Sequence, residues 1–324
     1  MDEQDLADHD GSTDRDGSDG NHSRDGGGGG AGETATETFV AHRNLLFTVA
    51  YEMLGSASDA EDVLQETWLR WAGVDLERVD DRRAYLVRIT TRQALNRLRA
   101  LSRRKEAYVG QWLPEPLLTA PDVAQDVELA ESVSMAMMLV LETLSPTERA
   151  VFVLREAFDV GYDEIAAALD KSPAAVRQIA HRARRHVDAR RPRRTVSASQ
   201  TRAALESFRH ALDSGDLQGL LDVLAPDVVL VGDGGGVKRA ALRPLFGAGK
   251  VGRFILGGTG KVAGRLTVTP TVANGSPAFL AYLDGELDGV MVFHVEDARI
   301  AGIYYVRNPE KLGRIEAETA LTLR

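Results

Sequence analysis

The chain has 324 residues, a formal net charge of −9, 44% hydrophobic residues and no cysteine. The absence of cysteine excludes disulfides, thiolate nucleophiles, cysteine zinc sites and iron–sulfur ligation. The longest apolar run, Met135–Leu141, is far shorter than the ~20 residues that a membrane-spanning helix needs. Because the N-terminal residues lack a basic stretch followed by an apolar one, we expect no secretory signal and a cytoplasmic protein without membrane contacts.

The negative charge is concentrated in residues 1–38, which contain eleven acidic residues and two arginines. The remaining 286 residues therefore have a net charge of zero. Within them, Arg82–Lys105 contains nine basic and no acidic residues, and Lys171–Arg194 contains nine basic residues and one acidic residue. Two concentrated basic segments on a neutral body predict surfaces that bind phosphate backbones.

Residues 1–38 are rich in Asp, Gly and Ser, and Leu6 is their one large aliphatic side chain. Such a segment cannot bury enough apolar area to offset its ordering entropy, so it is predicted to be a disordered, solvated tail. A second interpretation is that this acidic tail competes with DNA for the basic segments.

Three helices are expected after the tail. Apolar residues recur with helical spacing over Phe39–Leu54. Ser58 followed by Glu61 predicts a capping box for a second helix that continues to Trp71. A third helix, from about Arg82 to Arg104, is expected to bury its apolar side chains and expose its arginines.

A linker and a helix-turn-helix follow. Two prolines in Trp112-Leu-Pro-Glu-Pro-Leu117 forbid a helix, and the apolar Trp112 and Leu113 predict that this extended linker docks on another part of the protein. Ser145-Pro-Thr-Glu148 predicts a helix start. Next come a short helix at 161–169, a turn at Asp170–Pro173 and a basic helix from Ala174 to about Arg190, an order typical of a helix-turn-helix.

Residues 197–324 have a different pattern. Two short helices are expected, at Gln200–Asp213 and Leu217–Leu224, and strands are expected after them. Helices followed by several strands predict an α+β domain with an antiparallel sheet. The predicted strands are 227–232, 265–273, 278–283, 289–295 and 300–306.

The residue types of the two basic segments suit contacts with DNA. Arginine and glutamine can make bidentate contacts with guanine and adenine edges in the major groove. In the second segment, the side chains predicted to project from the recognition helix are Arg177, Gln178, His181, Arg182 and Arg184. In the first segment, the predicted phosphate contacts are Arg88, Arg92, Arg99, Arg103 and Arg104, and the predicted base contacts are Gln93 and Asn96. The alternative for each segment is a basic, solvated helix.

Residues 39–191 resemble the group 4, or extracytoplasmic-function, bacterial sigma factors. Asp59-Ala-Glu-Asp-Val-Leu-Gln-Glu-Thr-Trp-Leu69 resembles region 2.2 of that family, which binds core RNA polymerase. Arg82–Lys105 resembles regions 2.3 and 2.4, which melt and read the promoter −10 element. Ser145–Arg190 resembles region 4, which reads the −35 element. The polymerase contacts that the resemblance implies are Asp59, Glu61, Asp62, Gln65, Glu66, Trp68 and Leu69.

The last part of the chain resembles a SnoaL-like domain, as found fused to some of these sigma factors. Three motifs show the resemblance: the 112–117 linker, Asp233-Gly-Gly-Gly236 and Asn308-Pro-Glu-Lys-Leu312. The motif residues with an implied regulatory role are Trp112, Leu113, Pro114, Glu115, Asp233, Gly234, Gly235, Asn308, Pro309 and Lys311. Val237 separates the glycines from Lys238, a departure from the family pattern that leaves the role of this lysine open. The segment Lys311–Arg324 is expected to dock.

The resemblance implies a non-enzymatic subunit that binds core RNA polymerase and promoter DNA, without cofactor or metal. Its SnoaL-like domain is expected to regulate the sigma core in cis, so that no separate anti-sigma factor is required. The expected units are a 1–38 tail, region 2 at 39–107, a linker at 108–130, region 4 at 131–194 and the SnoaL-like domain at 197–324. Alternatively, the C-terminal domain is a small-molecule sensor or a vestigial enzyme, for which the candidate residues are Asp227, Asp233 and His294.

Overall fold

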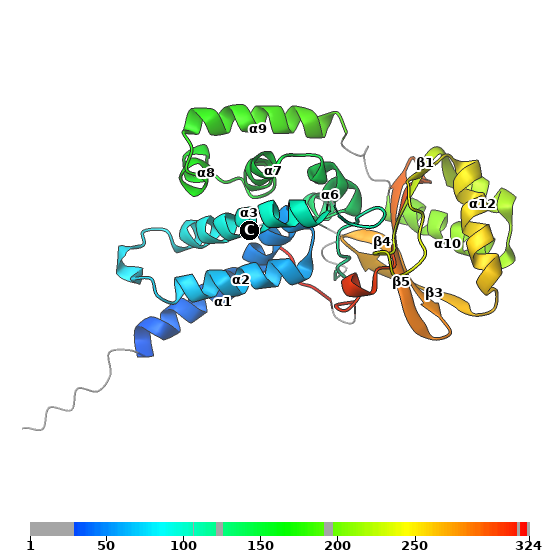
Figure 1. Cartoon of the computed structure of the whole chain (residues 1–324), viewed down its shortest axis with the longest axis horizontal. Helices are drawn as coiled ribbons and strands as arrows, with labels where there is room; N and C mark the ends of the chain where they lie inside the picture. Colours follow the sequence, from blue (N-terminus) through cyan, green and yellow to red (C-terminus); the bar gives the residue numbers. More distant parts are fainter. Residues whose placement is uncertain (1–28, 106, 121–125, 191–196, 316–317, 323–324) are drawn as a thin grey trace, which may run out of the picture.

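The computed structural model describes residues 29–105, 107–120, 126–190, 197–315 and 318–322. Figure 1 shows a helical part joined to a C-terminal sheet domain. The helical part consists of α1 (Gly29–Leu54), α2 (Ala57–Trp71), η1 (Leu76–Arg78), α3 (Arg82–Lys105), α5 (Val127–Ser132), α6 (Met135–Glu142), α7 (Pro146–Phe152), η2 (Val153–Ala157), α8 (Tyr162–Leu169) and α9 (Pro173–Asp188). None of the helices in these described ranges is long and apolar enough to cross a membrane.

Helix α1 begins earlier than the sequence pattern predicted. The prediction of disorder up to residue 38 is wrong for residues 29–38, which form the first turns of α1. Ala35 is buried, and its carbonyl oxygen accepts a hydrogen bond from the indole nitrogen of Trp71 at 2.9 Å. Trp71 of α2 therefore supplies a contact to this part of α1 that the local composition did not predict. Residues 1–28 lie outside the described part of the chain.

The cap of α2 also differs from the prediction. Ser56, not Ser58, is the N-cap, and its hydroxyl accepts a hydrogen bond from the Asp59 amide. The predicted capping box before α7 is confirmed, with Ser145 and Glu148 each bonding the other's backbone. The predicted helix-turn-helix is confirmed as well, in α8 and α9. One continuous apolar core includes residues of α1, α2, α3, α7, α8 and α9, so the two predicted regions of the sigma core pack together.

The C-terminal domain confirms the predicted α+β class. Its elements are α10 (Ala198–Ser214), α11 (Leu217–Val223), β1 (Leu224–Asp233), β2 (Leu245–Phe246), α12 (Ala248–Thr259), η3 (Gly260–Val262), β3 (Leu266–Ala273), β4 (Ser276–Leu283), β5 (Glu286–Glu296), β6 (Arg299–Val306) and η4 (Pro309–Lys311). The strand order is β2-β1-β6-β5-β4-β3. The expectation of a purely antiparallel sheet is wrong, because β1 pairs with β6 in parallel. After β1 the chain crosses over through α12 to the far edge of the sheet, and it returns beside β1 in the same direction.

The two faces of the sheet pack against different partners. Helices α10, α11 and α12 cover one face, where Phe293 packs edge to face against Phe208 and Phe279 at centroid distances of 5.1 and 5.0 Å. The other face packs against Leu113 of the linker and Met135 of α6. The C-terminal segment, red in Figure 1, leaves β6 and runs back to the helical part. The expected docking of this segment is therefore confirmed over its described residues.

Candidate nucleic-acid interface

The outer face of α9 brings most of the predicted recognition residues together. Ser172 caps the helix and Pro173 occupies its first turn, while Val176 and Ala183 are buried against the rest of the helix-turn-helix. The opposite face is therefore exposed. It forms a shallow hollow of about 350 Å³ lined by Arg177, Gln178, His181 and Arg182.

Arg184 lies apart from this group. Its guanidinium donates two hydrogen bonds to the carboxylate of Glu156, at 2.5 and 3.1 Å. Both side chains belong to the helical part, so this ion pair holds η2 against α9. The sequence pattern did not separate Arg184 from its neighbours because Glu156 lies 28 residues away along the chain.

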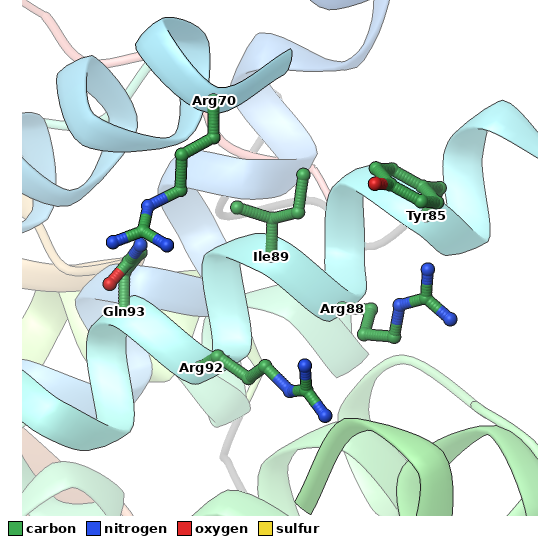
Figure 2. A pocket seen from close by; sticks show the side chains of 6 residues that line it. All are labelled: Arg70, Tyr85, Arg88, Ile89, Arg92 and Gln93. Carbon is green, nitrogen blue, oxygen red and sulfur yellow. The ribbon is translucent and has the colours of Figure 1, made fainter. Parts of the chain in front are cut away.

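A second hollow lies between α2 and α3, on the predicted −10 face. Its volume is about 230 Å³, and it is lined by Arg70, Tyr85, Arg88, Ile89, Arg92 and Gln93, all labelled in Figure 2. The Arg88 guanidinium lies 4.6 Å from the centre of the Tyr85 ring, whose centroid is 5.9 Å from that of Trp71. Cationic and aromatic side chains in one hollow are the groups that bind phosphates and stack on unpaired bases.

Gln93 does not lie where the sequence pattern placed it. Its side chain is only 6% exposed and, with the amide oxygen turned towards α2, it accepts a hydrogen bond from Nη2 of Arg70 at 2.9 Å. The end of α2 therefore covers most of Gln93, and the base contact expected of it stays a prediction. Asn96 and Arg99 are exposed, as predicted. The side chains of Arg103 and Arg104 lie outside the described part of the chain.

The predicted polymerase face of α2 divides into an exposed half and a paired half. Gln65 and Glu66 are exposed, and Leu69 has 68% of its surface exposed. Trp68 is half-buried, with its ring 5.3 Å from that of Phe39.

The acidic residues of this face have partners within the chain. Arg97 of α3 contacts Asp59 and Asp62, at 2.6 Å each. Glu61 accepts a hydrogen bond from Arg43 at 2.7 Å and one from Arg314 of the C-terminal segment at 3.3 Å. The C-terminal segment therefore reaches the predicted polymerase face.

The three predicted regulatory motifs meet at the buried carboxylate of Asp233. Its Oδ2 accepts hydrogen bonds from the Leu113 amide at 2.9 Å and from Lys311 Nζ at 2.7 Å. Its Oδ1 accepts hydrogen bonds from the Tyr108 hydroxyl at 2.6 Å and the Gly235 amide at 3.0 Å. Burial lowers the pKa of Lys311, and the Asp233 carboxylate opposes that lowering.

The glycines of the second motif are required by this close packing. A Cβ at Gly234 would lie 1.9 Å from the Lys238 carbonyl oxygen. A Cβ at Gly235 would lie 2.4 Å from the side chain of Asn308, and its φ of +61° is in the left-handed region. Lys238 itself pairs with Asp288 at 3.2 Å, so the displaced lysine has a role within the C-terminal domain.

The linker also contacts α2 and α3 of the helical part. Lys105 Nζ and Lys311 Nζ lie 3.3 and 4.3 Å from the centre of the Trp112 ring. The Glu115 carboxylate accepts hydrogen bonds from the amides of Ala57 and Ser58, at 2.8 and 3.3 Å, where the N-terminus of α2 favours a negative charge.

Two buried residues that the sequence analysis did not identify complete this junction. Asn274 bonds the backbone of Leu117 and donates hydrogen bonds to the Tyr51 hydroxyl at 2.6 Å and the Val133 carbonyl oxygen at 3.0 Å. The Tyr51 hydroxyl in turn donates to the Glu115 carbonyl oxygen at 2.7 Å. Asn274 begins an Asn-Gly turn and has a φ of +54°. The Asn-Gly dipeptide predicts a hairpin turn, but it gives no sign that the asparagine side chain bonds Tyr51 and Val133.

The three residues considered for an enzymatic alternative have different surroundings. Asp227 is exposed and lies six residues before Asp233 on the same strand, a separation of about 20 Å. All the contacts of the buried Asp233 described above are structural. His294 pairs with Glu296 at 2.8 Å. Among the described residues, no group of three His, Asp or Glu side chains is placed to hold a metal.

Comparisons with known proteins agree with this geometry. Residues 38–104 match the family model described as Sigma-70 region 2, and residues 134–187 match Sigma-70, region 4. The chain is 37% identical to the ECF RNA polymerase sigma factor SigJ of Mycobacterium tuberculosis, over 84% of this chain and 91% of the relative. It is 33% identical to the probable ECF RNA polymerase sigma factor SigI of the same species, over 86% and 94%.

The crystal structure of the Mycobacterium tuberculosis extracytoplasmic function sigma factor SigJ has the same overall fold. It matches with a TM-score of 0.69 at 33% sequence identity, and the match covers 89% of this chain and 100% of that chain. The chain therefore belongs to the extracytoplasmic-function sigma factors of RNA polymerase, and its function is promoter-specific transcription initiation.

Proposed function

We propose that this sigma factor reads a two-part promoter, with α3 at the −10 element and α9 at the −35 element. The observation that supports this most directly is the hollow on α9, where four polar side chains gather on one exposed face. Arg177 and Gln178 are the types that form bidentate contacts with base edges. Asn96 and Arg99 on α3, with the cationic and aromatic hollow beside them, suit an unpaired strand.

Selection from random double-stranded DNA tests this proposal. Holoenzyme reconstituted with core RNA polymerase should recover two conserved blocks at a fixed spacing. Arg177→Ala should relax the base preference at one position of the upstream block, since a bidentate contact is worth about 1–3 kcal/mol of discrimination. Arg184→Ala is the matched control, because Glu156 already binds that guanidinium, and it should leave both blocks unchanged. An Arg177→Ala protein that bound every sequence equally less well would refute the assignment.

We also propose that the C-terminal domain regulates the sigma core in cis, without a separate anti-sigma factor. The support is the convergence of Leu113, Tyr108 and Lys311 on Asp233, which ties the linker between the two DNA modules to the sheet domain. Tethering gives the domain a millimolar-scale effective concentration at the linker. The packed phenylalanines between helices and sheet favour action by contact over catalysis.

Run-off transcription with core polymerase tests the regulatory proposal on the full-length chain. Asp233→Asn removes the charge on which the linker contacts converge, and it should raise transcription at limiting sigma factor because it releases the linker. A variant with a released linker and unchanged polymerase binding and transcription would contradict the proposal.

A further inference from the structure

A third cationic segment lies in the C-terminal domain, in addition to those of α3 and α9. Residues 234–283 contain seven basic residues and no acidic residue. Two of the seven pair with carboxylates, Lys238 with Asp288 and Arg265 with Asp284. The other five are exposed and make no ion pair with the residues that the structure describes. They are Arg239, Arg243, Lys250, Arg253 and Lys261.

Exposed apolar side chains are concentrated in the same part of the chain. In the described ranges, seven large apolar side chains are exposed, and four of them lie between residues 237 and 254. These four are Val237, Leu242, Phe246 and Phe254, with exposed fractions between 46 and 72%. A cluster of exposed apolar side chains is typical of a binding surface.

The composition of this stretch favours a lipid surface over nucleic acid. Residues 237–258 contain only lysine, arginine, apolar residues, glycine and one proline. They include no amide or hydroxyl side chain, whereas the DNA-facing surface of α9 includes Gln178. Surfaces that bind DNA combine cations with such hydrogen-bonding side chains. Cations combined with protruding apolar side chains are typical of proteins that bind the surface of an anionic bilayer.

Helix α12 presents this combination on one face. Val251 and Ile255 are buried in the core between the helices and the sheet, so they face inward. Lys250, Arg253 and Phe254 are exposed and follow the i, i+3, i+4 spacing of a single helix face. Figure 1 shows α12, in yellow, on the side of the sheet domain away from the helical part.

Two glycines on the exposed side of α12 have no role in internal packing. A Cβ at Gly257 or Gly258 would meet no atom within 4 Å. Glycine within a helix is destabilising relative to alanine, but it allows the backbone to approach another surface closely. The glycines therefore suit a helix that lies flat on a binding partner.

We propose that the outer face of α12 is a peripheral binding site for an anionic bilayer, with Phe254 inserted among the lipids and the unpaired cations attracted to the headgroup phosphates. A helix of this kind lies in the plane of the interface, and the 12 residues of α12 are too few to span a bilayer. Arg239 and Arg243 contribute from the preceding loop, because the attraction of an anionic surface extends over about 10 Å. The expectation of a protein without membrane contacts concerned secretory signals and spanning helices, and a surface contact needs neither.

Sedimentation with lipid vesicles tests this site on the full-length protein. Vesicles of phosphatidylglycerol and phosphatidylcholine in equal parts should bind the wild type, and vesicles of phosphatidylcholine alone should not. Arg253→Glu should weaken binding about 20- to 30-fold, because one basic residue near an anionic surface contributes about fivefold and the reversal adds an equal repulsion. Phe254→Ser should weaken binding about tenfold, because it removes the inserted ring.

Arg202→Glu is the matched control for Arg253→Glu. It makes the same change of charge at an exposed position of α10, in the same domain. Because charges beyond the screening length contribute little, this variant should bind the anionic vesicles within about twofold of the wild type. Equal losses in Arg202→Glu and Arg253→Glu, or equal binding to both kinds of vesicle, would refute the site on α12.

Affinity for DNA separates a bilayer from nucleic acid as the partner of α12. Arg253→Glu should bind the selected promoter DNA as tightly as the wild type does. An equal loss of affinity for DNA and for vesicles would make nucleic acid the partner and overturn the proposal.

The depth of a spin label tests the insertion of α12. Because the chain contains no cysteine, Gly257→Cys introduces a single labelling site, and a Cβ there meets no neighbouring atom. With anionic vesicles, the nitroxide at this site should become accessible to oxygen and inaccessible to a water-soluble nickel chelate. A nitroxide at Ala203→Cys, exposed on α10, should remain accessible to the chelate. Equal access of the chelate to both sites would contradict the insertion.

Discussion

Replacing Asp233 with asparagine should free the linker from the C-terminal domain. The carboxylate is fully buried and accepts four hydrogen bonds, two at each oxygen. An asparagine can keep only the two at its oxygen, so its amide would face two donors. If the oxygen stays with Tyr108, the Leu113 amide loses its acceptor and the Lys311 ammonium loses its charged partner, keeping only the Leu113 carbonyl oxygen. A buried unsatisfied donor costs about 1–3 kcal/mol and a charged one more, which gives about 3–5 kcal/mol in total.

Hydrogen exchange followed by mass spectrometry measures this loss directly. Exchange of the linker peptide that includes Leu113 should become about 100- to 4,000-fold faster, since each 1.4 kcal/mol corresponds to a factor of ten. Burial already lowers the pKa of Lys311, and loss of the Asp233 charge lowers it further. The difference in exchange rate between Asp233→Asn and the wild type should therefore become smaller as the pH rises and Lys311 becomes neutral. Asp284→Asn, which removes an exposed partner of Arg265, is the control. Wild-type exchange rates in Asp233→Asn would refute this reasoning.

Three further substitutions test other parts of the structure. Gly235→Ala should lower the free energy of unfolding by about 2–3 kcal/mol in urea, because its φ is left-handed and its Cβ would overlap Asn308; wild-type stability would contradict the close packing there. Leu69→Glu should weaken binding to core polymerase about tenfold without changing the melting temperature, whereas Val237→Glu, at an equally exposed site on the other domain, should change neither. Burial raises the pKa of Glu52 from 4.5 to about 7, so the stability of the wild type should fall by up to about 3 kcal/mol as the pH rises from 4.5 to 7. Glu52→Gln should remove that fall, as measured by thermal unfolding at several pH values. The same pH dependence in both proteins would rule out Glu52 as its source.

Local sequence signals predicted the secondary structure of the helical part and of most of the sheet. The capping box at Ser145 and the turn before Pro173 depend on neighbouring residues, so they could be found without tertiary information. Helix α12 contains four glycines and was not predicted, because its stability comes from Val251 and Ile255 packing on the sheet domain. Likewise, the polar start of α1 receives a contact from Trp71 that the local composition did not predict.

The sequence predicted which side chains lie together where one face of one helix decides their positions. Four residues of α9 lie together for that reason. Nothing in the sequence indicated the partners that distant residues supply: Arg70 bonds Gln93, and Glu156 binds Arg184. A charged residue on an exposed helix face has the same sequence signal whether it is free or paired. The same limit applies to Asp233, which was identified through its glycine motif while its bonds to Tyr108 were not.

Run-off transcription from the selected two-block DNA tests most directly whether this chain directs polymerase to a two-part promoter. Core polymerase with the wild-type chain should give a product of one length, and scrambling either block should abolish it. With Arg177→Ala, templates that differ from the selected upstream block at one position should give as much product as the selected block itself. A product that forms equally well when either block is scrambled, or that needs no added chain, would contradict the account.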